Sequence, residues 1–281
     1  MLTVLEIIKR TTGFLEKRGV ESARLNSELL VGHALGLKRM QLYMQFERPL
    51  TEAELDKIRP LVKRRGDREP VQYIIGETDF GGLKLRVDRR ALIPRPETEY
   101  LIELLVQRLS EAPASVLDLG TGSGAIALAL AKAYPEASVT GVDKSAEALA
   151  LARENRATCG LDERVTLLES DWFSTLPGGV AFELIVANPP YLSDTETSET
   201  PAEVKGFEPV MALSAGENGA AALEKILTDA PGFLNPGGLL ACETGTAQHA
   251  ALQQLASTSG YSRTESLRDL TGRDRYLLAF R

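Results

Sequence analysis

The chain has 281 residues, of which 43% are hydrophobic and 25% are charged, and its formal net charge is −7. This composition excludes a mainly disordered chain, a collagen and a small disulfide-stabilised protein. No apolar run reaches about 18 residues, so no membrane span is expected. The N-terminus carries Glu6 and Glu16 and lacks a long apolar stretch, which argues against a secretory signal or a transit peptide. We therefore expect a cytoplasmic protein with more than one domain.

Cysteine and histidine are scarce in this sequence. Only Cys159, Cys242, His33 and His249 are present, and none of their spacings is typical of zinc ligands. We therefore expect no metal site. A hydrolase that uses a Ser-His or Cys-His pair is also not expected, because the chain has only two histidines and two cysteines.

Residues 1–70 have a helical pattern. Thr3 and Glu6 fit a capping box at the start of one helix, and Gly19 fits its end. An apolar stripe predicts a second helix over 25–36, and a further capping box predicts another over 51–66. The sequence thus predicts a small helical N-terminal domain over residues 1–70.

This helical segment holds fourteen Lys or Arg residues against ten Asp or Glu residues, although the whole chain is acidic. The excess gathers in one cluster: Lys57, Arg59, Lys63, Arg64 and Arg65. Such a cluster is either a solvated helix face or a patch that meets an acidic or nucleic-acid-associated partner. A dedicated DNA-binding domain would be basic throughout, and this chain is not.

The pattern changes after residue 70. Segments 71–75 and 83–87 are typical of strands, and Asp79–Gly82 between them is typical of a turn, so we predict a β-hairpin linker over residues 71–93. Residues 94–281 then predict a parallel α/β sheet covered by helices on both faces. The predicted strands are 116–119, 139–142, 165–168, 184–187 and 239–242, and the predicted helices are 122–133, 146–157 and 220–227. A last strand over 276–280 is expected to lie antiparallel to 261–267, and 193–204 is expected to be a long loop.

A glycine-rich turn lies between the first predicted strand and helix of this sheet, and it reads Asp118-Leu119-Gly120-Thr121-Gly122-Ser123-Gly124. Glycines there let the backbone turn tightly and approach a ligand. The pattern alone also satisfies the dinucleotide fingerprint, and Asp143 after the next strand fits the ribose of a nicotinamide cofactor or of S-adenosylmethionine. Asp118 favours S-adenosylmethionine, because a carboxylate repels a pyrophosphate and attracts a methionine ammonium.

A second motif, Asn188-Pro189-Pro190-Tyr191, directly follows the predicted strand 184–187. This position is the carboxyl edge of the sheet, where such folds bind ligands. The prolines make the backbone rigid, so the Asn188 side-chain oxygen and the Pro189 carbonyl can accept both hydrogens of a planar –NH₂ group. Tyr191 can flank that group. The motif therefore indicates methyl transfer to an amide or an exocyclic amine.

On these motifs the whole chain resembles the release factor glutamine methyltransferases, a family of class I, S-adenosylmethionine-dependent enzymes. The resemblance extends over the segments 68–76, 92–99, 170–173 and 207–216. It implies a Rossmann-like class I methyltransferase sheet in an α/β protein, with a small N-terminal helical domain and a β-hairpin linker. The loop 193–204 and the segment 243–245 receive no role from it.

The resemblance also implies the site residues. Catalysis and substrate binding would fall to Asn188, Pro189, Pro190 and Tyr191. Cofactor binding would fall to Asp118, Gly120, Thr121, Gly122, Ser123, Gly124, Asp143, Lys144, Asp171, Trp172 and Asn188, with Arg95, Glu97 and Thr98 near the methionine tail or the lid. Asp143 would take the ribose hydroxyls, and Asp171 and Trp172 would border the adenine.

The implied reaction methylates the side-chain amide nitrogen (N5) of the Gln in the Gly-Gly-Gln motif of class I peptide chain release factors, with S-adenosylhomocysteine as product. We expect a monomer that contacts neither membrane nor nucleic acid directly, with the helical domain making a second contact to the release factor. Three alternatives stay open: a nucleic-acid amine methyltransferase acting on adenine N6 or guanine N2, a non-catalytic binding module and, more distantly, a nicotinamide dehydrogenase.

Overall fold

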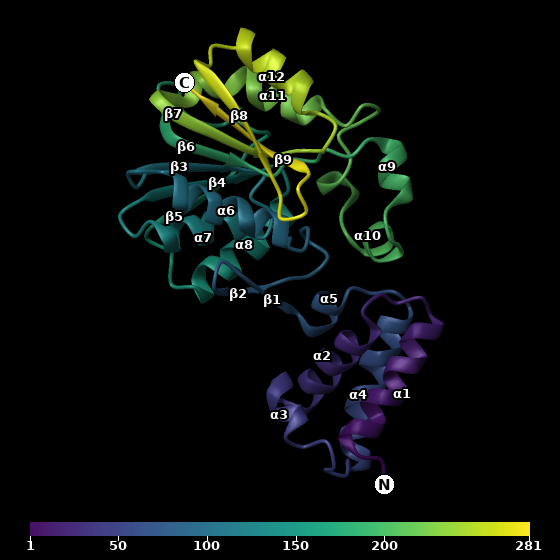
Figure 1. Cartoon of the computed structure of the whole chain (residues 1–281). Helices are drawn as coiled ribbons and strands as arrows, with labels where there is room; N and C mark the ends of the chain where they lie inside the picture. The colour runs from purple at the N-terminus through teal and green to yellow at the C-terminus, as the bar shows by residue number, and fades with distance from the viewer. The chain divides into compact units, whose positions relative to one another are not determined.

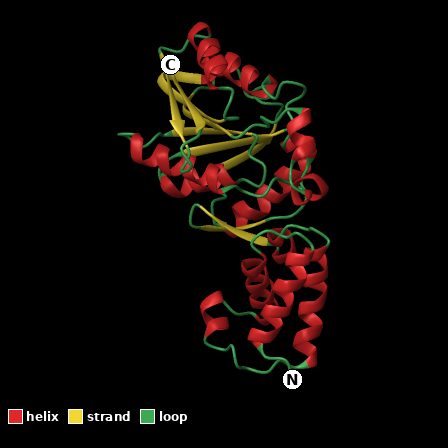
Figure 2. Cartoon of the chain, turned by 45° about the vertical axis from the view of Figure 1, so that its right-hand side comes forward, coloured by secondary structure: helices red, strands yellow, loops and turns green.

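The computed structural model describes residues 1–281, and the chain divides into two compact units. The first unit comprises Met1–Glu77 and Pro201–Phe207, and the second comprises Thr78–Thr200 and Glu208–Arg281. The first is helical, whereas the second contains the large sheet (Figures 1 and 2). No helix of the chain is long and apolar enough to cross a lipid bilayer. The boundaries at residues 70 and 93 expected from the sequence stay a prediction.

The first unit is built from α1 (Val4–Lys17), α2 (Ala23–Leu35), α3 (Arg39–Tyr43), α4 (Glu52–Gly66), α5 (Val71–Ile75) and α10 (Ala202–Phe207). The predicted capping boxes are present: the Thr3 hydroxyl accepts from the Glu6 amide, and Thr51 caps α4 in the same way. Gly36 ends α2 with a φ of 67°. Aliphatic side chains of α1, α2 and α4 form its core, including Ile8, Val31 and Ile58.

The strand predicted over 71–75 is wrong, because these residues form the one-turn helix α5. Pro70 precedes the helix, and Gly76 ends it with a φ of 86°. Ile74 packs beside Leu15 and Leu30 in a small core. Packing of this face and the flanking Pro and Gly therefore outweigh the β-branched composition.

The basic cluster of α4 is not a free patch. Arg59 pairs with Glu52 and Asp56, and Arg64 pairs with Glu69. The Arg65 side chain is only 6% exposed. The tertiary structure thus leaves Lys57 and Lys63 as the exposed members without an ion pair.

Glu203 of α10 bridges two arginines of the first unit. Its carboxylate accepts from Arg65 at 2.8 Å and from Arg68 at 2.6 Å, and Arg65 also donates to Asn26 Oδ1 at 2.8 Å. Arg68 has a φ of 73°, a conformation that non-glycine residues rarely adopt. The bridge holds this backbone and the α10 segment in the first unit.

We expect Glu203→Ala to destabilise the first unit by about 2 kcal/mol, because it leaves the buried Arg65 guanidinium without its charged partner. Hydrogen exchange of the α2 and α4 amides in urea measures this unit alone. Glu16→Ala removes an exposed carboxylate of α1 and serves as the control. Equal protection factors in the two variants would contradict the bridge.

The second unit contains a seven-stranded sheet in the order β5-β4-β3-β6-β7-β9-β8 (Figure 1). Its strands are β3 (Ser115–Leu119), β4 (Ser138–Asp143), β5 (Val165–Glu169), β6 (Phe182–Ala187), β7 (Leu234–Glu243), β8 (Arg263–Arg268) and β9 (Asp274–Phe280). Strands β3 to β7 are parallel, and β9 is antiparallel to both β7 and β8. The α/β fold class and the terminal antiparallel strand are confirmed.

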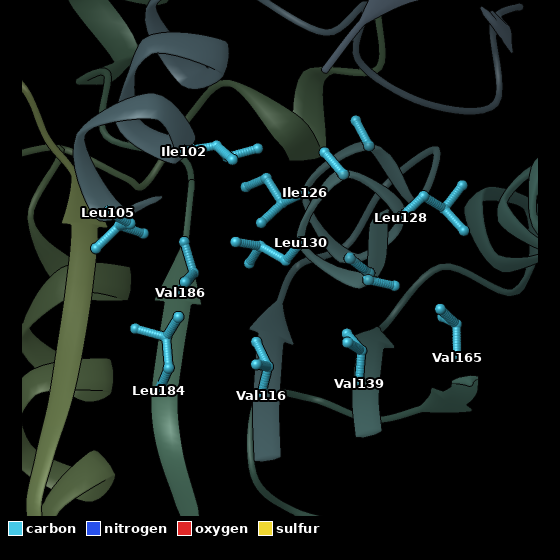
Figure 3. Packing of buried hydrophobic residues seen from close by; sticks show 14 of the residues in the cluster. Ile102, Leu105, Val116, Ile126, Leu128, Leu130, Val139, Val165, Leu184 and Val186 are labelled. Carbon is cyan, nitrogen blue, oxygen red and sulfur yellow. The ribbon is translucent and has the colours of Figure 1, made fainter. Parts of the chain in front are cut away.

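Helices cover both faces of this sheet. Side chains from α6 (Pro96–Arg108), α7 (Ala125–Ala133) and α8 (Ala146–Thr158) pack on one face, where Val116, Val139 and Leu184 point toward Ile126 and Leu130 (Figure 3). Helices α11 (Ala221–Asp229) and α12 (His249–Thr258) cover the other face. The central parallel strands β3 and β6 are thus almost entirely buried, which explains their continuous apolar runs, whereas the edge strand β5 keeps exposed residues.

Several short elements differ from the sequence-based expectations or refine them. A hairpin is present, and its second strand β2 (Leu83–Arg86) agrees with the prediction. Its first strand is β1 (Glu77–Phe80), so Asp79 and Phe80, predicted in the turn, belong to a strand. The segment 193–204 is not a plain loop, because Ser193 and Glu196 form a capping box that begins α9 (Asp194–Glu199), and α10 follows it. Helix α7 begins at Ala125 rather than at 122. Short 3-10 helices span Val210–Ala212 and Ala230–Phe233.

Candidate active site

The carboxyl ends of four neighbouring parallel strands bring polar residues into one row. Leu119 of β3 is in register with Val142 of β4 and Ala187 of β6, and Ala187 is in register with Cys242 of β7. The residues one step beyond this line are Gly120, Asp143, Asn188 and Glu243. Three of them were predicted from the sequence, and the strand register explains why they meet.

The glycine-rich turn follows the end of β3, and its glycines adopt left-handed backbone conformations. Gly120, Gly122 and Gly124 have φ values of 72°, 56° and 84°, which other residues adopt only with strain. A Cβ on Gly124 would lie 3.3 Å from both Ala152 and Leu128, so this glycine also allows close helix packing. The predicted tight turn is therefore present, and Gly124 lies where the turn packs against Leu128 and Ala152.

Asp118 lies behind this turn. It is fully buried, and its Oδ2 accepts from the Thr121 hydroxyl at 2.6 Å and from the Ala127 amide at 3.0 Å. Its Oδ1 has no hydrogen-bond partner, and burial raises the pKa of Asp118 to about 7. The expected contact with a methionine ammonium is not what this geometry shows, because Asp118 does not line the cavity described below. The carboxylate instead braces the turn and the start of α7.

This burial predicts a pH dependence of stability. The pKa of Asp118 rises from 3.8 to about 7 on folding, so the folded protein keeps a proton that the unfolded chain loses. The contribution to stability is full below about pH 4 and is lost as pH rises through about 7. We expect Asp118→Asn to flatten the decline of the unfolding free energy between pH 5 and pH 8 in urea titrations. A decline of the same slope in both proteins would contradict it.

Asp143 anchors the next part of the site. Its Oδ2 accepts from the Gly122 amide and its Oδ1 from the Ser145 amide, both at 2.8 Å. Burial raises the pKa of Asp143, and these backbone donors oppose that rise. The carboxylate therefore joins the glycine turn to the start of α8 and keeps further lone pairs for a ligand.

Trp172 and Asp171 follow β5 at the same edge. Trp172 has a φ of 56°, and the Ser170 hydroxyl supports this turn by donating to the Trp172 carbonyl at 2.8 Å. Its ring lies 3.5 Å from the position of a Cβ on Gly120. Asp171 forms an ion pair of 3.1 Å with Lys144, and both side chains are largely exposed. A strained aromatic residue over a glycine turn is a feature typical of binding sites.

Arg95 and Glu208 connect two segments far apart in the sequence. Arg95 Nη2 lies 2.7 Å and 2.8 Å from the two carboxylate oxygens of Glu208, whose side chain is only 1% exposed. Arg95 lines the cavity, but its charge is already paired. Glu97, predicted beside it, does not line the cavity, and its carbonyl accepts from Tyr276 at 2.8 Å.

Asn188 belongs to a hydrogen-bonded chain that the sequence did not reveal. Its Nδ2 donates to Thr98 Oγ1 at 2.9 Å, and Thr98 Oγ1 donates to Glu243 Oε2 at 2.6 Å. The Tyr191 hydroxyl donates to Glu243 Oε1 at 3.0 Å. Burial raises the pKa of Glu243, while Thr98, Tyr191 and the Arg275 guanidinium oppose the rise.

These elements enclose a cavity of ≈ 260 Å³. Of the predicted residues, it is lined by Arg95, Thr98, Gly120, Thr121, Gly122, Ser123, Asp143, Lys144, Asp171, Trp172, Asn188 and Pro190. The others lie outside its wall: Glu97, Asp118, Gly124, Pro189 and Tyr191. Glu208 and Glu243 were missed, and the available signal for Glu243 was a carboxylate at the end of a predicted parallel strand.

Two family models match the chain: the PrmC N-terminal domain over residues 6–76 and the methyltransferase small domain over residues 98–204. The release factor glutamine methyltransferase of Rhodopirellula baltica is 41% identical over 281 residues, which cover 98% of this chain and 95% of the relative. The corresponding protein of Geobacter sulfurreducens is 43% identical, covering 97% and 95%.

The chain belongs to the release factor glutamine methyltransferase family.

The fold agrees with solved methyltransferase structures. The T. thermophilus 16S rRNA N2 G1207 methyltransferase, in complex with S-adenosylmethionine and guanosine, has a TM-score of 0.52 and is 20% identical, covering 73% of this chain and 49% of that one. This likeness concerns the fold. The family membership confirms the resemblance that the sequence motifs predicted, and it covers both the helical segment and the sheet.

Proposed function

We propose that this chain transfers a methyl group from S-adenosylmethionine to the side-chain amide nitrogen (N5) of the Gln in the Gly-Gly-Gln motif of class I peptide chain release factors. The observation that carries the proposal is the position of Asn188: it lines the cavity at the sheet edge, in a member of the release factor glutamine methyltransferase family. No observation favours methylation of a nucleic-acid amine.

The cavity wall suits S-adenosylmethionine. Three of its four cationic residues, Arg90, Arg95 and Lys144, are already paired with carboxylates, so these three offer little to a pyrophosphate; the fourth is Arg89. Asp143, Asp171 and Trp172 line the cavity, and this supports the proposal that Asp143 accepts from the ribose hydroxyls while Asp171 and Trp172 border the adenine. This donor set fits a positively charged methionine sulfonium with a ribose and an adenine, and it argues against a dinucleotide.

When bound, S-adenosylmethionine would supply an electrophilic methyl group on sulfur, and S-adenosylhomocysteine would be the product. An amide nitrogen is a weak nucleophile, because its lone pair is conjugated into the carbonyl. The Asn188 oxygen accepts one N–H group and orients the nitrogen toward the methyl group. The Pro189 carbonyl is the acceptor predicted for the other N–H group, although Pro189 itself lies outside the cavity wall. The new N–C bond forms as the S–C bond breaks, and the surplus proton leaves nitrogen for solvent. No residue with the reactivity of a catalytic His is needed.

We propose a release factor as the partner, as the names of the relatives support, and we propose that this chain acts on it as a monomer in the cytoplasm. The exposed lysines Lys57 and Lys63 of the helical unit remain available for a second contact with it, whereas Arg64 and Arg65 are paired within the unit. This contact accounts for selectivity beyond the small cavity, since a pocket that holds one Gln cannot by itself select a whole protein.

Mass spectrometry tests the proposed function. A purified unmethylated class I release factor is incubated with this chain and S-adenosylmethionine, and the same factor with Gln→Glu in Gly-Gly-Gln is the control. We expect one added methyl group on the Gln-bearing peptide and none on the control. An unmodified factor, together with methyl transfer to an RNA or DNA amine in parallel reactions, would transfer the assignment to a nucleic-acid substrate.

A further inference from the structure

The side chain of Asn188 is held from one end only. Its Nδ2 donates to Thr98 at 2.9 Å, whereas its Oδ1 has no hydrogen-bond partner and is not buried. Asn188 lines the cavity, so this oxygen is the end left for a ligand. An Asn amide can be turned by 180° with almost no change of shape, and only its neighbours determine which end faces outward.

The neighbouring hydrogen bonds run in one direction. Glu243 is 1% exposed, and its two oxygens face the hydroxyls of Thr98 and Tyr191. The Thr98 and Tyr191 hydroxyls donate to these oxygens, so both hydroxyl protons point at the carboxyl group. The Thr98 oxygen then has only lone pairs to offer to Asn188.

Arg275 supplies the positive charge beside this chain of hydrogen bonds. Its guanidinium carbon lies 5.7 Å from the centroid of the Tyr191 ring, and its charge opposes the rise in the pKa of Glu243. Arg275 donates to the Thr244 carbonyl at 3.0 Å, and it shares its charge with Asp269, whose Oδ2 lies 3.8 Å from Arg275 Nε. Burial and the Glu97 carboxylate raise the pKa of Glu243, and Arg275 opposes that rise. The acceptor role of Glu243 therefore rests on geometry, with the Thr98 and Tyr191 hydroxyls 2.6 Å and 3.0 Å from its two oxygens.

We propose that Thr98 and Glu243 are positioning residues that hold the Asn188 amide with its oxygen toward the cavity, and thereby make the site select an amide N–H group over a carboxylate. The inference rests on the proposed function and specifies how that site distinguishes Gln from Glu. The Gln and Glu side chains of the substrate differ only in that Gln carries an –NH₂ group where Glu carries a second oxygen. An outward amide oxygen attracts the first and repels the second, whereas a turned Asn188 would present its own –NH₂ group and favour the carboxylate.

The experiment measures this discrimination directly. The Kd of the release factor with Gly-Gly-Gln is compared with the Kd of the same factor carrying Gln→Glu, for the wild type and for Thr98→Val. Valine keeps the shape of Thr98 but removes the oxygen that accepts from Asn188. We expect the preference for the Gln form to fall about tenfold in Thr98→Val, the effect of one lost orienting hydrogen bond. Thr98→Ser keeps the hydroxyl and should keep the preference.

Glu243→Gln provides a second variant of unchanged size. Its –NH₂ group can donate to Thr98, which turns the Thr98 hydroxyl toward Asn188 and lets the amide reverse. We expect the preference to fall in this variant as well, with the S-adenosylmethionine Kd changed less than about threefold. A purely structural role would weaken binding of the Gln and Glu forms by the same factor in both variants, and that result would overturn the proposal.

Failure of the two proposals can be told apart. If the wild type does not methylate the Gln factor, the proposed function fails, and the inference fails with it. If the wild type methylates the factor and the Gln-to-Glu preference is equal in wild type, Thr98→Val and Glu243→Gln, only the inference fails. Circular dichroism melting curves show whether each variant is folded before its Kd values are compared.

Discussion

Replacement of Asn188 by Ala is expected to lower kcat about 10³-fold, with the Kd for S-adenosylmethionine changed less than about threefold. The side-chain oxygen that would accept from the substrate amide is lost, whereas the glycine turn and Asp143 remain in place. Single-turnover methylation of a release factor measures the chemical step, and titration with S-adenosylmethionine measures the cofactor.

Asn235→Ala is the matched control, because Asn235 lies near the start of β7, at the opposite edge of the sheet. It should retain wild-type rates. Equal losses of turnover and cofactor affinity in Asn188→Ala would instead assign Asn188 to cofactor binding.

Replacement of Asp143 by Ala is expected to weaken S-adenosylmethionine binding about 10³-fold. Two charge-assisted hydrogen bonds to ribose hydroxyls are worth about 4 kcal/mol together, at about 2 kcal/mol each. The same change removes the acceptor of the Gly122 and Ser145 amides, so the glycine turn also loses its anchor. Isothermal titration with S-adenosylmethionine measures the loss.

Asp171→Ala serves as the comparison for Asp143→Ala. Asp171 lines the same cavity, but its side chain is 51% exposed and forms a solvent-exposed ion pair with Lys144. Exposed ion pairs and hydrogen bonds contribute little, so we expect a loss of less than about tenfold. A larger effect for Asp171→Ala than for Asp143→Ala would mean that the adenine side dominates cofactor binding.

The two halves of the site differ in what holds them. The cofactor side is held by the backbone, through three glycines in the left-handed conformation and the backbone amides that donate hydrogen bonds to Asp143. The substrate side depends on side chains, through the bonds from Asn188 to Thr98 and from Thr98 to Glu243. We therefore expect substitutions on the cofactor side to alter affinity, and substitutions on the substrate side to alter rate and selectivity.

Much of the sheet could be predicted from local patterns. Apolar runs followed by Gly, Asp and Asn mark the ends of β3, β4 and β6, because parallel strands buried on both faces are continuous in hydrophobicity. Helix starts were predicted where a capping box was noticed, as at Thr3 and Thr51. The capping box of Ser193 and Glu196 is the local pattern that indicates the start of α9.

Errors arose where distant contacts outweigh local preference. Val71–Ile75 has the composition of a strand, but packing of Ile74 against α1 and α2 and the flanking Pro70 and Gly76 make it a helix. Arg64 and Arg65 look like part of a basic patch, yet Glu69 and Glu203 pair with them. Glu203 is 138 positions from Arg65, so no local pattern could show the pair.

The sequence by itself determined the alternation of strands and helices, the glycine turn and the polar residues that follow the strands, because each depends on neighbours within a few positions. Only the tertiary structure decided that Asp118 braces the turn from behind and that Glu243 lies within hydrogen-bonding distance of Thr98 and Tyr191. Strand order and register set those distances, and they join Thr98 and Glu243 across 145 positions of the chain.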